Sequence, residues 1–535
     1  MSEEAPDTKG TSLDGPGPEE TAEKPKRRLF TRSDEKKKEI AEKRKAKAEK
    51  VAAKKAEKEE QRKKKAAEKA EYRKSRSDAS QAKKEEKLAA KQAKKDEKEA
   101  KKLRKALAAV PEADEQEDKL FGREPDENGI DINFDLVMEE SLAKNEYPKE
   151  KLNAARAADH TSLAAKFCTQ EIWDQYKDTV SSGPAKWTLA RAINSGTLYP
   201  SSFVGCHAGD RESYDDFRDF FYPVIEAYHK GFSMEKGADL PGTASERMDP
   251  TKITEKLTDV AKAKIISTRI RVARNLAMFP LNPGGSKESR EEIAALMAKV
   301  YAGLEGHEEL AGELLLHTEM SDEARQQLVE DHLLFRGKDP MQAASGYHEH
   351  WPHGRGVFHN PAKSFVNWVN EGDHLRIISM QEGGDVEAVF ARLSAGAAAI
   401  EAGVRKETGI TEGEVFMMHP KFGAVTCCPS NIGTGMRGSV HILVPKLIKT
   451  IGFDAIDKLA RERNCQARGS SGEHSEVVDR IDISNWRRIG YPEYELVQDM
   501  IMCANFLAGE EDKIPDEPVE PAPAEGGVYK GRVFS

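Results

Sequence analysis

Hydrophobic and polar positions divide the chain into four stretches of unlike texture. Residues 1–130 hold few large apolar side chains, whereas apolar residues recur at helical spacing between 145 and 235. From 255 to 505 short β-branched runs alternate with helical patterns, and residues 506–535 are rich in Pro and Glu. The pattern predicts a charged low-complexity tail and linker, a small helical domain, a larger mixed domain and a flexible acidic, Pro-rich tail.

The helical domain is predicted from "SLAAKFCTQEIWDQYKDTV" and "YDDFRDFFYPVIEAYHKGF". The strands of the larger domain are predicted from "KIISTRIRVARNL", "SFVNWVN", "LRIISMQ", "GEVFMMHPKFGAVTCC" and "GSVHILVPKL". Helical patterns such as "DVEAVFARLSAGAAAIEAGV" and "YELVQDMIMCANFLAG" alternate with them. Hairpin-like spacing between several strands favours an α+β fold with an antiparallel β-sheet packed by helices.

Charge is distributed unevenly along the chain. Residues 24–105 carry about 35 Lys and Arg against about 16 Asp and Glu, so with a net charge of -9 the remainder is near -28. No heptad seam of apolar residues drives a coiled coil there. The basic segment is interpreted either as an attachment to an anionic partner (filament, nucleic acid or membrane surface) or as a solvated spacer.

The lack of a recognisable targeting signal and the spacing of the cysteines both favour a cytoplasmic location. The start "MSEEAPDTKG" is acidic and lacks the apolar run of a signal peptide. No stretch approaches the roughly 18 consecutive apolar residues of a membrane span. The six cysteines show no paired metal spacing and no pattern of a secreted disulfide framework.

A glycine pattern in "CCPSNIGTGMRGSVHI" resembles the dinucleotide-binding fingerprint, but its context does not. That fingerprint follows a strand and opens a helix, whereas "GTGMRG" precedes the β-branched run "SVHILVPKL". A phosphate loop of the G-x-x-x-x-G-K-[ST] type is also absent. Alternation along the run predicts that Arg437, Ser439 and His441 share one face of a strand.

Further arginines occur in strand-like or glycine-flanked strings. Arg269 and Arg271 stand two residues apart in "STRIRVAR", Arg376 lies in "DHLRIISM" and Arg468 in "QARGSSGEH". Each alone is most simply a surface ion-pair residue. Together they suggest a nucleotide site built as an arginine clamp, because guanidinium groups bind phosphate oxygens bidentately and neutralise charge in phosphoryl transfer.

Six motifs in order resemble the phosphagen (guanidino) kinase family, which includes arginine and creatine kinases. They are "STRIRVARNL", "DHLLF", "WPHGRGVFHN", "NEGDHLRIISMQ", "CPSNIGTGMRGSVHI" and "DISNWRRIG", and the similarity runs from about 145 to 505. The resemblance implies a small helical domain joined to a larger antiparallel-sheet domain. It also implies reversible transfer of the γ-phosphoryl group of MgATP to a guanidino nitrogen of a small-molecule substrate.

The resemblance also implies site residues. Those implied to bind ATP are Ser267, Thr268, Arg269, Ile270, Arg271, His332, Arg376, Arg437, Gly438, Ser439, Val440, His441, Arg468, Gly469, Ser470, Ser471, Gly472 and Glu473. Those implied to bind the guanidino substrate are Ser202, Phe203, Val204, Gly205, His207 and Cys428. Magnesium would be carried by ATP through phosphates and water, so no protein metal ligand is expected. Family members are monomers or dimers, and both states stay open.

Cys428 is implied to be the reactive cysteine beside the guanidinium. Surrounding arginines are expected to lower the pKa of its thiol, and a thiolate suits a cationic substrate. Its neighbour Cys427 is interpreted as an ordinary buried residue.

One position departs from the family pattern. The family has Asn-Glu-Glu-Asp, whose second glutamate holds and polarises the guanidinium, whereas this chain has Gly372 there, between Glu371 and Asp373. The missing carboxylate is expected to weaken orientation and base catalysis. Glu473, which matches the loop glutamate of arginine kinases, or Glu371 or Asp373 turned inward, would compensate. The alternative is a catalytically weakened nucleotide-binding or scaffold protein.

The segment from Gly196 to Tyr214 bears on the choice of guanidine. Its length matches the substrate-specificity loop of arginine kinases. Phe203 and His207, however, occupy positions at which arginine kinases share Gly and Tyr. Arginine is the first choice, and taurocyamine, lombricine and creatine stay open. Protein-arginine phosphorylation is disfavoured because that related group lacks the helical domain.

Overall fold

The computed structural model describes residues 134–158, 161–239, 242–335, 337, 339–469 and 479–515. The predicted tail and linker over 1–130 therefore lie outside the described residues, as do Ser470, Ser471, Gly472 and Glu473.

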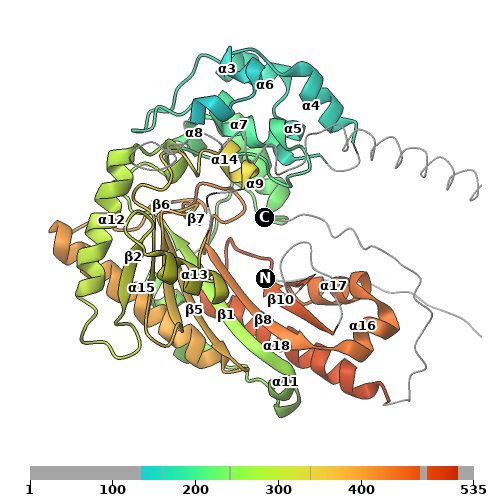
Figure 1. Cartoon of the computed structure of the whole chain (residues 1–535). Coiled ribbons are helices and arrows are strands. Elements are labelled where there is room, and N and C mark those ends of the chain that lie inside the picture. Colours follow the sequence, from blue (N-terminus) through green and yellow to red (C-terminus); the bar gives the residue numbers. More distant parts are fainter. Residues whose placement is uncertain are drawn as a thin grey trace, which may run out of the picture. The chain divides into compact units, whose positions relative to one another are not determined.

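The first part of the described chain is helical, as predicted (Figure 1). It consists of η1 (Phe134–Val137), α3 (Glu140–Ala143), α4 (Lys149–Arg156), α5 (Leu163–Phe167), α6 (Gln170–Tyr176), α7 (Leu189–Leu198), α8 (Ser213–Asp216) and α9 (Arg218–Tyr228). Side-chain caps set several starts: the Ser162, Thr169 and Thr188 hydroxyls accept hydrogen bonds from backbone N–H groups of the first turn. Thr169 thereby divides one continuous apolar pattern into α5 and α6.

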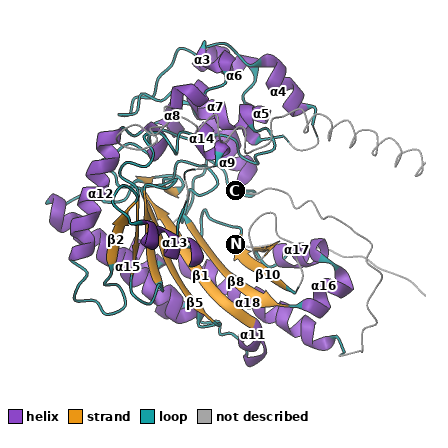
Figure 2. Cartoon of the chain, viewed as in Figure 1, coloured by secondary structure: helices purple, strands orange, loops and turns teal. Residues whose placement is uncertain are grey.

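The larger part is built on an eight-stranded sheet in which every neighbouring pair is antiparallel (Figure 2). In spatial order the strands are β2 (Glu313–Leu316), β3 (Gly356–His359), β4 (Phe365–Val369), β5 (Leu375–Glu382), β1 (Ile265–Arg274), β8 (Met436–Leu443), β10 (Arg480–Asn485) and β9 (Cys465–Gly469). The α+β prediction is confirmed.

The remaining helices lie before, between or after these strands in the chain. They are α10 (Ala244–Arg247), η2 (Pro250–Lys252), α11 (Asp259–Lys264), η3 (Asn282–Gly284), α12 (Lys287–Ala302), α13 (Asp322–Glu330), α14 (Pro340–Ala344), α15 (Val386–Thr408), α16 (Pro445–Ile451), α17 (Phe453–Arg461) and α18 (Glu493–Lys513). The large core joins α12, α15 and α18 to the inward residues of the sheet, such as Ile270, Ile377 and Val440. Burying these apolar side chains is the main stabilising contribution.

One predicted domain boundary and one predicted strand need correction. The C-terminal tail was expected from 506, but α18 continues to Lys513, and Leu507 and Ala508 are buried in the large core. The run "GEVFMMHPKFGAVTCC" forms only two short strands, β6 (Met418–His419) and β7 (Gly423–Ala424). Met417, Phe422 and Val425 of this run pack against the helical part, whereas Val415 is buried in the large core. Across the described residues, no helix is both long and apolar enough to span a membrane.

A second core joins the helical part to the cysteine-bearing loop of the larger part. The buried aromatic residues Trp173, Trp187 and Phe221 belong to it, and so do Cys427 and Cys428. Ala208 N–H donates to Cys427 O at 2.8 Å, and His229 Nε2 lies 2.8 Å from Pro429 O. The helical part therefore fixes the position of this loop above the sheet.

Candidate active site

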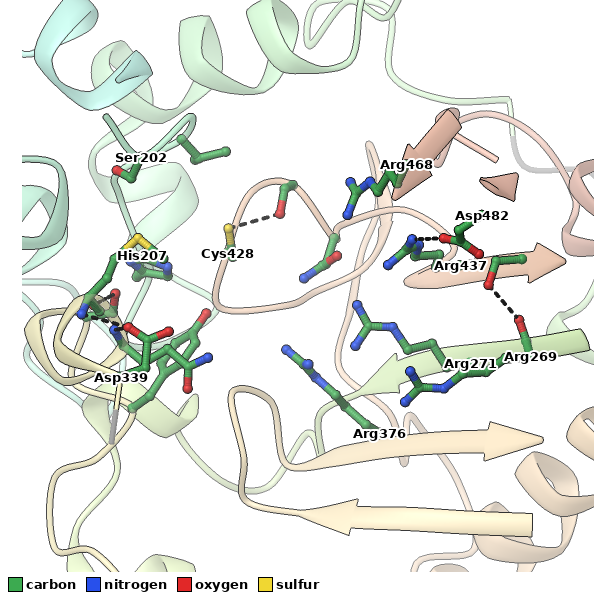
Figure 3. Close-up of a pocket in the computed structure, with 18 of the residues that line it drawn as sticks. Ser202, His207, Arg269, Arg271, Asp339, Arg376, Cys428, Arg437, Arg468 and Asp482 are labelled. Atoms are coloured by element: carbon green, nitrogen blue, oxygen red, sulfur yellow. Dashed lines mark hydrogen bonds and ion pairs between the residues drawn. The ribbon is translucent and has the colours of Figure 1, made fainter. Parts of the chain in front are cut away.

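A cavity of about 750 Å³ lies where the sheet, the cysteine-bearing loop and the segment after α7 meet. Its lining residues from the sheet are Ser267, Arg269, Arg271, Arg376, Arg437, Ser439, His441, Arg468, Gly469 and Asp482. The remaining lining residues are Ser195, Ser202, Val204, Gly205, His207, His332, Asp339, Met341, Gln342, Ser345, Tyr347, Cys428, Ser430 and Asn431. In the view of Figure 3 the arginines gather on one side, Ser202, His207 and Asp339 on the other, and Cys428 between them.

Strand alternation selects which residues of β1 face the cavity. Ser267, Arg269 and Arg271 line it, because every second side chain points to the same face. Thr268 and Ile270 point away: Thr268 Oγ1 donates to Gly383 O at 2.8 Å, and Ile270 is buried in the large core. The implied ATP contacts of these two side chains are corrected, since neither residue lines the cavity.

The same alternation holds on β8, as the sequence predicted. Arg437, Ser439 and His441 line the cavity, directly opposite residues of β1 in the antiparallel register. Val440 faces the large core, and Gly438 has no side chain to contribute. The implied ATP contact of the Val440 side chain is therefore corrected in the same way.

The glycine pattern before β8 makes a turn, not a helix start. Gly433 and Gly435 have φ values of 99° and 63°, which disfavour other residues. A Cβ at Gly433 would lie 2.3 Å from Arg488 O, so the turn also needs the missing side chain to pack closely. The predicted strand after these glycines is confirmed as β8, and a strand at this place is not the context of a dinucleotide fingerprint.

Positive charge is in excess at the sheet end of the cavity. Arg437 pairs with Asp482, and the Arg269 guanidinium lies over the Trp368 ring at 5.7 Å. Among the described residues, no carboxylate forms an ion pair with Arg269 or Arg271. Desolvation by the surrounding protein, together with neighbouring arginines, lowers the pKa of Arg269 to about 10 and that of Arg271 well below its ordinary value. Both guanidiniums stay charged near neutral pH, so this end of the cavity is suited to a polyanion.

The two carboxylates that flank Gly372, those of Glu371 and Asp373, bind other groups of the protein. Glu371 Oε2 lies 2.8 Å from Arg376 Nε and accepts from Gly372 N–H at 2.5 Å. Burial disfavours the charge of Arg376, but Glu371 and Asp373 outweigh burial and raise its pKa. Asp373 Oδ1 accepts from Asn275 Nδ2 at 2.8 Å and from Cys427 N–H at 3.0 Å. Neither carboxylate lines the cavity, so Glu371 is placed as a partner of Arg376; its implied catalytic role stays a prediction.

Cys428 lines the middle of the cavity and is 6% exposed. Its Sγ lies 3.1 Å from Ser430 Oγ. Burial raises the pKa of the thiol, and the opposing effects of Ser430 and Arg488 do not overcome it. The expected lowering by arginines is therefore wrong for this structure, because desolvation dominates at this position.

The segment after α7 forms the other end of the cavity. Ser202, Val204, Gly205 and His207 line it, whereas Phe203 turns away and packs edge-on against Tyr228, with centroids 5.5 Å apart. The implied substrate contact of the Phe203 side chain is corrected accordingly. Burial lowers the pKa of His207 to about 3, so this imidazole is neutral.

Several lining residues escaped the sequence interpretation. Asp482, the partner of Arg437, could have been found, because "RIDIS" alternates like a strand. Asp339 and Tyr347 could not, since they lie in or next to α14 and reach the cavity only through the tertiary fold. Asp339 Oδ1 caps α14 by accepting from Met341 N–H at 2.9 Å.

A clamp of guanidinium groups on one face of a sheet neutralises charge on a transferring phosphoryl group. Fold and site together define a phosphotransferase. In the described part of the chain, no three His, Cys, Asp or Glu side chains gather to hold a metal ion. A phosphate-carried magnesium ion fits this arrangement, because the clamp binds the phosphates and leaves the ion to them.

Comparison with known proteins identifies the family. Residues 158–226 match the N-terminal domain and residues 292–514 the C-terminal catalytic domain of ATP:guanido phosphotransferases. Arginine kinase of Artemia franciscana is 39% identical over 365 residues, which are 67% of this chain and 95% of that protein. The chain belongs to the ATP:guanido phosphotransferases, the phosphagen kinases, and it is similar over most of its relatives' length to arginine kinases. Members of this family use ATP, generally with Mg²⁺.

Solved structures agree in fold but differ in substrate. The structure of lombricine kinase is 31% identical with a TM-score of 0.60, covering 67% of this chain and 95% of that chain. The substrate-free duplicated taurocyamine kinase from Schistosoma mansoni is 32% identical with a TM-score of 0.60, covering 69% of this chain and 49% of that chain. The fold therefore leaves the guanidine to be decided by residues of the site.

Proposed function

We propose that this phosphagen kinase transfers the γ-phosphoryl group of MgATP reversibly to the guanidino group of arginine and so buffers ATP. The observation that carries the proposal is the cavity in which an arginine clamp faces Cys428 and the segment after α7. The choice of arginine is supported by relatives described as arginine kinases, two of which are 39% and 38% identical.

The chain's own residues divide the work between two ends of the cavity. Arg269, Arg271, Arg376, Arg437 and Arg468 hold the phosphate groups of the nucleotide. Bound magnesium would neutralise further phosphate charge. Cys428 and the segment from Ser202 to His207 hold the guanidino substrate in line with the γ-phosphate.

The thiol of Cys428 responds to the charge beside it. Burial keeps it protonated in the free enzyme, since its pKa is raised. A guanidinium bound next to the sulfur favours the thiolate, because opposite charges a few ångströms apart stabilise each other. By reciprocity the thiolate strengthens binding of the cation.

A coupled assay of ADP release tests this function. The full-length protein is assayed with MgATP and each of arginine, creatine, taurocyamine, lombricine and glycocyamine. Turnover with arginine above the other four supports the proposal. Turnover with another guanidine reassigns the substrate, and silence with all five removes the kinase activity.

Gly372 favours a second candidate function. A chain that lacks the carboxylate at this position, and whose Glu371 is engaged by Arg376, would bind nucleotide without transferring phosphate. Such a binding or scaffold protein is distinguished by calorimetry. Tight MgADP binding combined with silence toward every guanidine supports it, whereas turnover excludes it.

We further propose that the protein works in the cytoplasm and that residues 24–105 attach it to an anionic surface. All six cysteines are free, which suits a reducing compartment. The excess of about 19 positive charges in this segment supplies the attraction. Binding of the full-length chain to phosphatidylserine vesicles, actin filaments and duplex DNA at rising salt would name the surface. Absence of salt-sensitive binding to all three would leave the segment a spacer.

A further inference from the structure

The space beside Gly372 is occupied by the ring of Tyr347. A Cβ at position 372 would lie 2.9 Å from Tyr347 Cε2 and 3.1 Å from Arg376 Nη2. The backbone of Gly372 is not in the left-handed region, so its conformation does not itself require glycine. The requirement is one of space: a side chain at 372 and the ring of Tyr347 in its present place exclude each other.

Tyr347 is held firmly from several sides. Its carbonyl oxygen accepts from Arg355 Nη2 at 2.7 Å, and the same guanidinium donates through Nε to Asn370 O at 3.2 Å. The segment carrying Tyr347 is thereby tied to the turn that carries Gly372. The ring also meets His207 edge-on, with centroids 5.1 Å apart and planes at 77°.

The hydroxyl of Tyr347 contacts the thiol of Cys427, the residue next to Cys428. Cys427 Sγ lies 3.1 Å from Tyr347 Oη and 3.0 Å from Gly372 O. One thiol hydrogen satisfies only one of these oxygens, so donation to Gly372 O leaves the phenol to donate to sulfur. Cys427 and Gly372 are both small, and together they make the room that Tyr347 fills.

Tyr347 nevertheless reaches the cavity. It is 7% exposed and lines the cavity together with Cys428 and His207, both of which belong to the proposed substrate end. An aromatic ring attracts a guanidinium through its π-electrons, with an energy that grows when the pair is shielded from water. The neighbouring His207 is neutral and does not repel the cation.

We propose that Tyr347 is a specificity-determining residue that contacts the guanidino group where the family pattern would place a carboxylate at position 372. This inference rests on the proposed guanidino kinase function. Gly372 then leaves the space that the family's carboxylate would take, and the aromatic ring of Tyr347 occupies it. A glutamate restored at 372 is then harmful unless Tyr347 is also removed.

A double-mutant cycle on the full-length protein tests this inference. The variants are Tyr347→Ala, Gly372→Glu and the combination of both, with Tyr347→Phe as the conservative rescue. Tyr301→Ala is the matched control, because Tyr301 is an equally buried tyrosine of the large core that does not line the cavity. Each variant is measured by KM and kcat for arginine and ATP, by calorimetric binding of arginine with MgADP, and by thermal unfolding.

Tyr347→Ala is expected to weaken arginine binding and raise its KM about tenfold, with the KM for ATP nearly unchanged. Tyr347→Phe should stay within about threefold of wild type because the ring is retained. Gly372→Glu alone should lose activity roughly a hundredfold through overpacking, and the double variant should regain about tenfold of it. Tyr301→Ala should lower thermal stability without changing the KM for arginine.

Opposite outcomes overturn the inference. Gly372→Glu that is as active as wild type, or Tyr347→Ala that leaves arginine binding unchanged, shows that Tyr347 is only a packing residue. If the wild type turns over no guanidine, the kinase function fails separately. The binding measurement still decides the inference, which then stands if arginine binds and Tyr347→Ala weakens it, and falls if arginine does not bind or the variant makes no difference.

Discussion

Arg271 of β1 and Arg437 of β8 stand directly opposite each other in the antiparallel register, so their side chains share the cavity face of the sheet. Arg437 has Asp482 as a partner, whereas Arg271 pairs with no carboxylate of the described chain. Like charges held together without a counterion cost free energy in the empty enzyme. A bound polyphosphate recovers it, which couples stability to nucleotide binding.

Replacing Arg271 with Ala should therefore separate stability from activity. We expect Arg271→Ala to raise the free energy of unfolding of the ligand-free protein by on the order of 1 kcal/mol, because an unpaired charge is removed. Turnover should fall by roughly two orders of magnitude or more. Thermal unfolding with and without MgADP, and ADP-release kinetics, check both. Arg461→Ala, a surface ion-pair residue, serves as control. This account would be contradicted if Arg271→Ala lowered the unfolding free energy of the ligand-free protein while MgADP still stabilised the variant.

Cys428 should give the reaction an alkaline dependence. Because burial raises the pKa of this thiol, the thiolate fraction of the free enzyme grows as the pH rises above neutrality. We expect kcat/KM for the guanidine to increase across that range. Cys428→Ala should lower kcat/KM about a hundredfold and abolish its increase with pH. The buried Cys503, which does not line the cavity, provides the control Cys503→Ala. An unchanged pH profile in Cys428→Ala would refute the role.

Glu371 should behave as a positioning residue for Arg376. Loss of the charge in Glu371→Gln is expected to raise the KM for ATP by roughly tenfold and to cost about 1–3 kcal/mol of stability, because Arg376 loses its buried partner. Glu387→Gln, at an exposed ion pair with Lys256, is the matched control. A fall in kcat of about a thousandfold with unchanged KM would instead identify Glu371 as a catalytic base.

Buried histidines should make the fold sensitive to acid. Burial lowers the pKa of His229 to about 3 from an ordinary value of 6.5. Between these values the unfolded chain binds a proton that the folded chain does not, so the unfolding free energy falls as the pH falls. The slope is about 1.4 kcal/mol per pH unit for one such histidine, and it vanishes above pH 6.5.

The variant His229→Gln isolates this contribution. Denaturant unfolding between pH 4 and 8 should show a shallower acid slope than in wild type, by about 1.4 kcal/mol per unit below pH 6.5. His307→Gln, at an exposed position, should leave the slope unchanged. Equal slopes in wild type and His229→Gln would show that other groups carry the acid sensitivity.

Local pattern predicted part of the sheet end of the site. Alternation along "STRIRVAR" and "RGSVH" indicated Arg269, Arg271 and Arg437, because a strand turns successive side chains to opposite faces. The same rule, applied strictly, would have removed Thr268 and Val440 from the implied ATP contacts. The apolar patterns likewise predicted α15 and α18, although not that α18 continues to Lys513.

The substrate end was decided only by the tertiary structure. The raised pKa of Cys428 follows from burial under the helical part, which no local spacing contains. Gly372 looks in the sequence like a lost carboxylate, yet in the fold it is the gap that Tyr347 fills. Periodicity assigns a residue to a face of its own element. Which distant side chain meets that face depends on how the elements pack, and packing is a property of the whole chain.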